Sequence, residues 1–371
     1  MRSLIVSIGA GWQQSPSINK FIASGFRVIA IENGQVANNL DSRCIVKNIP
    51  FEPNLVLKSI SNVQHLVAFA FNNDAGQTCA ELINKRVSER FIRHPDTNIF
   101  SKKSALRGLI EREGLDQYLP PYLVLRKGAA NLFHDFVRSA PQGLIIKPNI
   151  GSGSRAISKI SNSVTAYQLG GILDKALNSS PDQAAIVECF VPGLEYSIEG
   201  LIDALGIVEI FAISKRVLVG DTFSAQKITM ITRKSPTFLT LKTWAELFFK
   251  TLSVKPTLFH CEVILSGETI FCIDLGFRGG GYWVSDYLVT RSLGTNPYHY
   301  LFDRIQNGVN PVEPSSELRE VLYLSNKDDQ VSWTNSTTNV KTEDYLALEP
   351  SGLIGTDAAR WGVVGRKTRD S

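Results

Sequence analysis

Three segments of the chain carry side chains that could bind phosphate groups and a metal ion. In the first, Gly143–Arg155, an apolar strand leads into Lys147 and Pro148 and then opens into a loop of small residues. Glycine and serine let backbone N–H groups approach anionic oxygens, and Lys147 adds a point charge at the end of the strand. A lysine before such a turn is also typical of a solvated strand end, so this segment becomes informative only together with the other two.

The other two segments carry acids. Glu188–Glu195 has a glutamate at each end of a Pro-Gly turn, and alone these glutamates read as ordinary surface acids. Further along, Phe259–Leu265 and Thr269–Leu275 are apolar strands separated by residues 266–268, a pattern typical of a β-hairpin.

Two acids belong to this hairpin. If residues 266–268 form the loop, Glu262 faces Cys272 and lies diagonal to Asp274 on one sheet face, with Cβ atoms roughly 7 Å apart. Two carboxylates in an apolar hairpin are unfavourable unless a cation or an arginine neutralises them. Hard oxygen ligands from two acids, together with substrate phosphates, describe a magnesium site. The alternative is an ion pair between Arg278 and one of the two acids.

The elements around these segments follow two patterns. In the first hundred residues strand and helix signals alternate, which predicts a parallel sheet. The expected strands are Leu4–Ile8, Phe26–Ile31 and Leu66–Phe71, with helices near residues 17–24 and 76–85.

The first of these strands is followed by a glycine turn, Gly9-Ala-Gly11, and the second ends at Glu32, which together imitate a dinucleotide-binding fingerprint. Gln14 stands where that fingerprint needs a residue small enough for close helix–strand packing. NAD binding is therefore disfavoured. The alternative is a doubly wound domain that contributes part of a substrate pocket at its strand ends.

After residue 100 the pattern changes. Residues 102–114 predict an amphipathic helix closed by Gly114, and the helix dipole disfavours lysines at its start unless an anion lies nearby. A small α/β unit at residues 122–192 and a β-rich region at residues 194–285 follow. We expect strands near Leu144, Ala156 and Ile186, and helices at Ala166–Leu177 and Leu239–Leu252.

Composition sets the broad class. The chain has 371 residues, 43% of them hydrophobic and 20% charged, which is enough for two or three globular domains. It has no run of eighteen apolar residues and no secretory signal pattern at its start, so we expect a cytoplasmic protein without a membrane partner. A formal charge of +4 without a basic run interleaved with aromatics does not favour nucleic acid. Five scattered cysteines without a C-x-x-C pair indicate neither a disulfide framework nor a zinc site.

Taken together, the segments resemble the ATP-grasp superfamily, specifically its carboxylate–amine ligases. The resemblance implies an α/β and α+β architecture, in which a Rossmann-like domain precedes an ATP-grasp fold of two α+β subdomains clasping ATP and a small C-terminal module. The corresponding ranges are residues 1–98, residues 99–310 with a lid subdomain at about 122–192, and residues 311–371.

The resemblance also implies a nucleotide site. Lys103, with Lys102 as its neighbouring candidate, resembles the family's first nucleotide lysine. Lys147 resembles its second, and Lys215 resembles a lysine that approaches the phosphates from the large subdomain. The glycine-loop residues that match are Gly151, Ser152, Gly153 and Ser154.

The family's E-x-x-[V/I]-x-G-x-E segment matches Glu188 to Glu195. On this resemblance Glu188 and the backbone near Phe190 and Val191 would meet adenine, and Glu195 the ribose hydroxyls. Further on, Glu262 and Asp274 match the family's two metal-binding acids for Mg²⁺, with Mn²⁺ as the other candidate. Arg278 matches the arginine of its E-x-N-x-R motif.

One position departs from the family. Gly276 stands where an asparagine usually adds a metal ligand, and glycine cannot supply a side-chain oxygen. The activity implied is formation of an acylphosphate from a small carboxylate and ATP, which an amine then opens, with Lys147 and Arg278 stabilising the transferred phosphoryl group. The alternative is a catalytically silent nucleotide-binding or regulatory protein. The partners implied are small-molecule carboxylates and amines, and a homodimer stays open.

Overall fold

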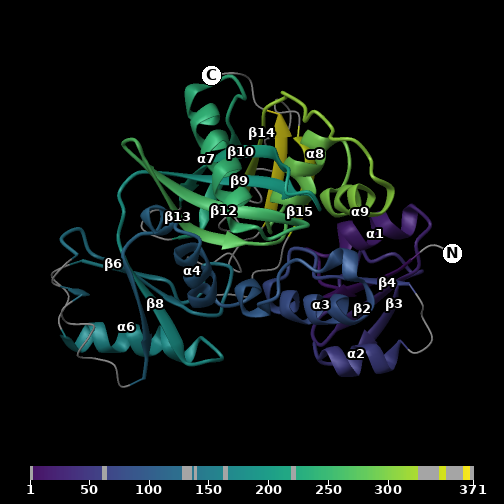
Figure 1. The fold of residues 1–371 in the computed structure, drawn as a ribbon, viewed down its shortest axis with the longest axis horizontal. Coiled ribbons are helices and arrows are strands. Elements are labelled where there is room, and N and C mark those ends of the chain that lie inside the picture. Colours follow the sequence, from purple (N-terminus) through teal and green to yellow (C-terminus); the bar gives the residue numbers. More distant parts are fainter. Residues whose placement is uncertain are drawn as a thin grey trace.

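The computed structural model describes residues 3–60, 65–127, 136–137, 140–161, 166–218, 223–324, 342–347 and 362–367. Figure 1 shows three lobes: an N-terminal domain at the lower right, a small subdomain at the lower left, and a larger β-rich body above both. A parallel sheet and two antiparallel sheets form the cores of these lobes.

The N-terminal domain is built on a four-stranded parallel sheet in the order β3-β2-β1-β4. Strands β1 and β4 are buried along their whole length, as expected for parallel strands with helices on both faces. The elements are β1 (Leu4–Ile8), α1 (Ser15–Ala23), β2 (Val28–Glu32), β3 (Ile45–Asn48), α2 (Pro53–Ser59), β4 (Leu66–Phe69), α3 (Asp74–Val87), η1 (Glu89–Phe91) and η2 (Thr97–Phe100).

The small subdomain is an antiparallel sheet in the order β5-β8-β6-β7, covered on one face by α6. Helix α4 precedes it and packs against the core of the large body. The elements are α4 (Lys103–Arg112), η3 (Asp116–Tyr118), β5 (Tyr122–Arg126), β6 (Leu144–Pro148), β7 (Ser158–Ile160), α6 (Ala166–Asn178) and β8 (Ala184–Cys189).

The large body is an eight-stranded antiparallel sheet in the order β13-β12-β9-β10-β11-β14-β16-β15. Helix α7 covers one face of β9 and β10, and η4 with α8 lies on the other side. The elements are β9 (Leu194–Ile202), β10 (Val208–Leu218), β11 (Ala225–Met230), α7 (Pro236–Leu252), β12 (Thr257–Ser266), β13 (Thr269–Gly276), η4 (Val284–Val289), α8 (Thr290–Leu293), α9 (Pro297–Asn307), β14 (Arg319–Leu324), β15 (Thr342–Ala347) and β16 (Gly362–Lys367).

The N-terminal domain is joined to the large body by a continuous apolar cluster. Phe21 of α1 packs edge to face against Phe302 of α9, and the same cluster includes Phe211 and Leu258 of the large sheet. This packing fixes the carboxyl ends of β1 and β4 beside the sheet that carries the acids of β12 and β13.

The C-terminal strands extend the large sheet. Strand β14 pairs with β11, and β16 pairs with both β14 and β15. The boundary of a separate C-terminal module at residues 311–371 stays a prediction. Residues 356–361 of this range lie outside the described part of the chain.

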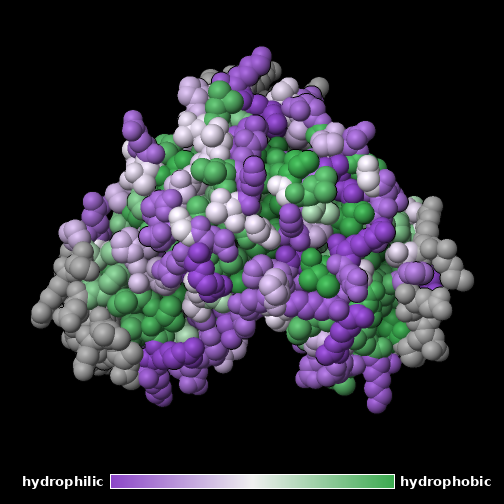
Figure 2. All heavy atoms as spheres, viewed as in Figure 1, coloured by the Kyte–Doolittle hydropathy of each residue, from purple (hydrophilic) through white to green (hydrophobic). Residues whose placement is uncertain are grey.

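The surface is mixed in character. Figure 2 shows hydrophilic and hydrophobic residues interspersed over this face, and a notch between the two lower lobes. Among the described residues, no helix is both long enough and apolar enough to cross a membrane.

Candidate active site

A cavity of about 660 Å³ lies where the three lobes meet. Its walls come from the glycine turn after β1, the end of β4, the small subdomain, and one face of the large sheet. The lining includes Gly11–Gln14, Asn72–Asp74, Lys103, Lys147, Gly151–Arg155, Glu188–Val191, Glu195, Arg216, His260, Glu262, Asp274, Arg278 and Tyr282. The three segments singled out from sequence therefore line one cavity.

The hairpin β12–β13 brings its two acids closer than the sequence predicts. The turn has two residues rather than three, because Ser266 pairs with Thr269. The register then shifts at Ile273, so that Glu262 pairs directly with Asp274 instead of with Cys272. The expectation of a Glu262–Cys272 pair was wrong, since a bulge cannot be read from strand alternation. Both carboxylates face the cavity from neighbouring strands.

Cations of the protein surround both acids. Lys103 Nζ lies 2.8 Å from Asp274 Oδ1, and Arg216 contacts Glu262. Burial opposes ionisation of both carboxyls, but the adjacent cations outweigh it. They lower the pKa of Glu262 to about 2 and hold that of Asp274 below its usual range. Both groups are therefore anionic near neutral pH. Asp274 is the anion that favours a lysine at the start of α4.

Arg216 also contacts Glu195, at 2.6 Å from its Oε1. Glu195 lies opposite Ile264 in the β9–β12 pair, on the same sheet face as Glu262. Burial, with Glu262 nearby, raises the pKa of Glu195 despite Arg216. Glu195 thus reaches the cavity, as the ribose-binding role requires, while sharing its arginine with a second acid.

Lys147 lies at the centre of a buried charge cluster. Its Nζ is 2.6 Å from Glu188 Oε2 and donates to the carbonyl of Ile273 at 2.7 Å. Arg107 of α4 contacts the same glutamate. Burial, reinforced by Arg107, lowers the pKa of Lys147 well below its ordinary value. An anion entering the cavity beside Lys147 would therefore favour its charged form.

The glycine loop after β6 lines the cavity with Gly151, Ser152, Gly153 and Ser154. Gly153 has a φ of 66°, and Ser154 has a φ of 57°. Ser154 is tied to the large body, because its hydroxyl donates to the carbonyl of Phe223 at 3.0 Å. The loop thus spans from the small subdomain towards the opposite wall.

The end of β8 forms the wall near the expected adenine site. Phe190 and Val191 line the cavity, and the Phe190 N–H donates to the Gly143 carbonyl at 2.9 Å. Lys159 Nζ lies 3.6 Å from the centre of the Phe190 ring. The Phe190 N–H is thus already engaged, which leaves its carbonyl and the following residue as the adenine contacts to test.

Lys215 needs a correction. The structure places it in an exposed position on β10, and it does not line the cavity. Arg216, the next residue, lines the cavity because successive strand residues point to opposite faces. The positive charge expected from this strand therefore comes from Arg216 rather than from Lys215.

Arg278 bridges two domains. Its guanidinium binds Asp74 at the start of α3, with Nη2 2.7 Å from Oδ2. The alternative of an ion pair with Glu262 or Asp274 is therefore replaced by a pair with the N-terminal domain. Arg278 still lines the cavity, and Gly276 leaves room for its side chain, because a Cβ there would lie 3.3 Å from Arg278 Cγ.

Comparison with known proteins agrees with this geometry. Residues 140–286 match the sequence model of the ATP-grasp domain. This segment is an ATP-grasp domain. No curated protein matches the chain in sequence.

Solved structures share the whole fold. The L-amino acid ligase of Bacillus licheniformis superposes with a TM-score of 0.72 at 15% identity, covering 99% of this chain and 93% of that one. The ADP complex of N5-carboxyaminoimidazole synthetase from Staphylococcus aureus gives 0.72 at 10% identity, with coverage of 99% and 94%. Biotin carboxylase of Campylobacter jejuni gives 0.69 at 11% identity, with coverage of 100% and 88%. At these identities the likeness shows that the complete chain has the fold of ATP-grasp ligases.

The ATP-grasp cavity offers a suitable donor set for a divalent cation. Glu262 and Asp274 supply carboxylate oxygens from paired positions, the ligand type that Mg²⁺ and Mn²⁺ accept. Among the described residues, no three His, Cys, Asp or Glu side chains are already gathered as a metal cluster. The acids are instead neutralised by Lys103 and Arg216, which a cation with phosphates would replace.

Sequence reasoning missed four charged residues of this site. Arg107 contacts Glu188, Arg216 bridges Glu195 and Glu262, and Glu199 contacts His260 beside Glu262. His260 and Glu262 lie two apart on β12, and the strand period of two could have placed His260 on the same face. The partners of Arg107 and Glu199 come from distant elements and left no sequence signal.

Proposed function

We propose that the protein is an ATP-dependent ligase that joins a small carboxylate to an amine, releasing ADP and phosphate. The observation that carries this proposal is the pair Glu262 and Asp274 in one cavity with Lys147 and the glycine loop. A nucleotide triphosphate with its cation meets the charge pattern of that cavity, since the acids suit the cation and the lysine and loop suit phosphates.

The nucleotide would occupy the side of the cavity formed by the small subdomain. The end of β8, at Phe190 and Val191, supports adenine, and Glu195 is placed for the ribose hydroxyls. Lys103, Lys147 and Arg216 face the phosphates, while residues 151–154 close over them. The solved ADP complex with the same fold supports a nucleotide in this cavity.

The carboxylate and the amine would occupy the other side, between the N-terminal domain and the loop after β13. Its walls include Trp12 and Tyr282, whose rings meet edge to face at 5.5 Å. The pair of Arg278 and Asp74 presents a guanidinium beside a carboxylate. Such a pair is complementary to a substrate that carries both a carboxylate and an ammonium group, as amino acids do.

In the reaction, an oxygen of the substrate carboxylate attacks the γ-phosphorus of ATP and ADP leaves, which produces an acylphosphate. The amine then attacks the acyl carbon, phosphate leaves, and the amine proton passes to solvent or phosphate. A bound divalent cation would neutralise the phosphate charge. Lys147 and Arg278 hold the transferred group, and the closed glycine loop keeps water from the acylphosphate.

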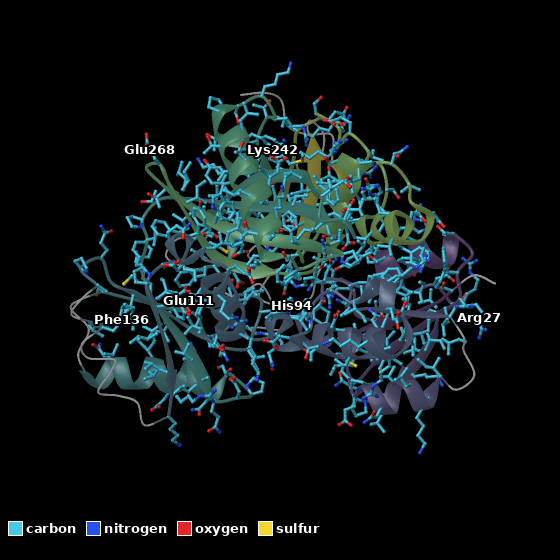
Figure 3. The ribbon with its side chains drawn as sticks, viewed as in Figure 1. Arg27, His94, Glu111, Phe136, Lys242 and Glu268 are labelled. Carbon is cyan, nitrogen blue, oxygen red and sulfur yellow. The ribbon has the colours of Figure 1, made fainter. Side chains whose placement is uncertain are left out.

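A silent nucleotide-binding protein is the second candidate, and Gly276 is the observation that favours it, because it provides no ligand side chain. The deciding experiment measures ADP release over a panel of amino acids, other carboxylates and amines. The wild type is compared with Asp274→Asn and with Glu268→Gln, an acid-to-amide control at the exposed tip of the same hairpin (Figure 3).

We expect substrate-dependent ADP release in the wild type and in Glu268→Gln, and a loss of at least about a thousandfold in Asp274→Asn. Equal rates for wild type and Asp274→Asn would rule out the ligase proposal. ATP binding without turnover across the panel would favour the silent alternative.

A further inference from the structure

The protein's own contribution to the proposed cation site is small. Glu262 and Asp274 are neighbours across β12 and β13, and Gly276 is the next residue of β13 on the same face. Because Gly276 has no side chain, the two acids leave much of a six-coordinate shell to other groups. This inference rests on the proposed function, since it concerns the cation that accompanies ATP.

His260 lies on the strand next to Gly276, the position that provides no ligand side chain. It pairs directly with Gly276 across the two strands and lies two residues before Glu262 on the same face of β12. It also lines the cavity, with 14% of its side chain exposed. The sheet thus sets an imidazole beside the two carboxylates.

The ring of His260 is held in a defined orientation. Its Nδ1 contacts Glu199 of β9, the residue opposite it in the β9–β12 pair. Glu199 is 2% exposed, so this contact is shielded from water. A histidine ligand of a metal is commonly fixed in this way, with a carboxylate on one ring nitrogen and the metal on the other.

The remaining nitrogen faces Glu262. His260 Nε2 lies 3.2 Å from Glu262 Oε1. Adjacent ligand atoms of an octahedral ion with bonds of about 2.1 Å lie about 3 Å apart. The separation of these two atoms therefore matches that of neighbouring ligands on one ion.

We propose that His260 Nε2 is the third protein ligand of the divalent cation, together with Glu262 and Asp274. Glu199 orients the ring. Burial opposes protonation of His260, but the carboxylates of Glu199 and Glu262 raise its pKa to about 10, so the Nε2 proton is present near neutral pH and is released to solvent when the cation binds. Imidazole suits Mn²⁺ better than it suits Mg²⁺, which prefers oxygen. The site therefore selects Mn²⁺ more strongly than two carboxylates alone would.

The test uses pulsed electron paramagnetic resonance of Mn²⁺ bound to the full chain in the presence of ADP. The protein is labelled with ¹⁵N-histidine, so a directly bound histidine nitrogen gives a hyperfine coupling to manganese. We expect this coupling in the wild type and its loss in His260→Gln. The matched control is His94→Gln, a histidine outside the cavity that is labelled in Figure 3, and it should retain the coupling.

Glu199→Gln provides a second variant that retains His260. The coupling should persist, while Mn²⁺ affinity falls by about tenfold or more, because the ring is no longer held by a carboxylate. Mg²⁺ affinity measured in competition should fall less than Mn²⁺ affinity in His260→Gln. Circular dichroism checks that each variant is folded.

The outcomes separate this inference from the proposed function. Mn²⁺ bound with ADP in the wild type but without a histidine coupling overturns the role of His260 and leaves the ligase proposal standing. Failure of the wild type to bind Mn²⁺ or Mg²⁺ with ADP overturns both. An unchanged coupling in folded His260→Gln would also refute the assignment.

Discussion

Two glycine-bearing loops line the cavity from opposite sides, and they differ in whether their N–H groups are hydrogen-bonded within the chain. In the turn after β1, the N–H of Gly11 donates to Gln14 Oε1 at 3.0 Å, and that of Ala10 donates to Glu32 Oε2 at 2.7 Å. In the loop after β6, no hydrogen bond among the described residues engages the N–H groups of residues 151–154.

A glycine-rich loop is available to an anion only if the chain leaves its N–H groups without other acceptors. Glu32, which in a dinucleotide site would bind ribose, instead accepts hydrogen bonds from Ala10, Asn33 and Gly34. Gln14 accepts the hydrogen bond of the Gly11 N–H, which a pyrophosphate would otherwise use. The first loop is thus closed by its own side chains, and the second remains available to phosphates.

Among the tests of this comparison between the two loops, the largest effect should come from Lys147, the charge beside the open loop. In Lys147→Met we expect ATP affinity to fall by about 2–3 kcal/mol, or about 30- to 150-fold, because a charge-assisted contact to phosphate is lost. Calorimetry with ATP and Mg²⁺ measures this directly. Lys175→Met, an exposed lysine on α6 of the same subdomain, is the control. Unchanged ATP affinity in a folded Lys147→Met protein would show that this lysine does not contact the phosphates.

A second test concerns the closed side of the cavity, where Asn72 Nδ2 donates to Asp286 at 3.3 Å. Burial raises the pKa of Asp286 from 3.8 to about 7, although Asn72 acts in the opposite direction. The folded state therefore favours the protonated acid. The contribution of Asp286 to the free energy of unfolding is therefore greatest below pH 3.8, declines as the pH rises and levels off above about pH 7.

Asp286→Asn should remove this dependence. Between pH 5 and pH 8 we expect the free energy of unfolding to fall by about 2 kcal/mol less in the variant than in the wild type. Urea denaturation at both pH values measures the difference, and Asp174→Asn, an exposed acid, serves as control. Parallel pH profiles for wild type and Asp286→Asn would show that Asp286 ionises normally.

A third test compares the glycines themselves. Gly9 has a φ of 112°, and a Cβ there would lie 2.8 Å from Asn73 Nδ2. Gly151 has no such restriction, since its nearest neighbour would be Pro148 at 3.5 Å. Gly9→Ala should therefore destabilise the fold by about 1–2 kcal/mol, whereas Gly151→Ala should leave stability nearly unchanged. Thermal unfolding of both variants measures these changes in stability. Equal losses of stability would contradict the distinction between the two glycines.

The smallest expected effect is a change in dynamics. Amide hydrogen exchange in residues 149–155 should slow when a non-hydrolysable ATP analogue binds, because phosphates give the open N–H groups partners. Exchange at Gly9, Ala10, Gly11 and Gln14 should change little, since their N–H groups are already hydrogen-bonded. Equal exchange of residues 149–155 with and without nucleotide would argue against closure of this loop.

Much of the fold could be predicted from the sequence, because long periodic segments carry strong signals. The strand Leu4–Ile8 matches β1 at both ends, and α7 extends the predicted helix by three residues at its start. The approach of Glu262 to Asp274 was also expected, although by a different register. Local patterns specify elements well, and they specify pairing only where no bulge intervenes.

The partners of the charged residues could not be predicted. Arg278 pairs with Asp74, which is 204 positions away, and Arg107 pairs with Glu188 across two subdomains. Such contacts depend on how domains pack, and no local pattern records this. The sequence could have predicted that Arg216 rather than Lys215 faces the cavity, because this needs only the alternation of side chains along β10 relative to Glu195.

The bulge at Ile273 determines which face of the sheet carries the Asp274 side chain. Without this bulge the pairing would continue in register, so Ile273 would lie opposite Glu262 and Asp274 would turn to the opposite face, among the apolar side chains beneath the sheet. The tip of the hairpin, where Glu268 is exposed, has no such constraint and is a suitable place for an insertion (Figure 3). A tag or a fluorescent reporter intended to follow this enzyme fold without disturbing its chemistry therefore belongs at Gly267–Glu268.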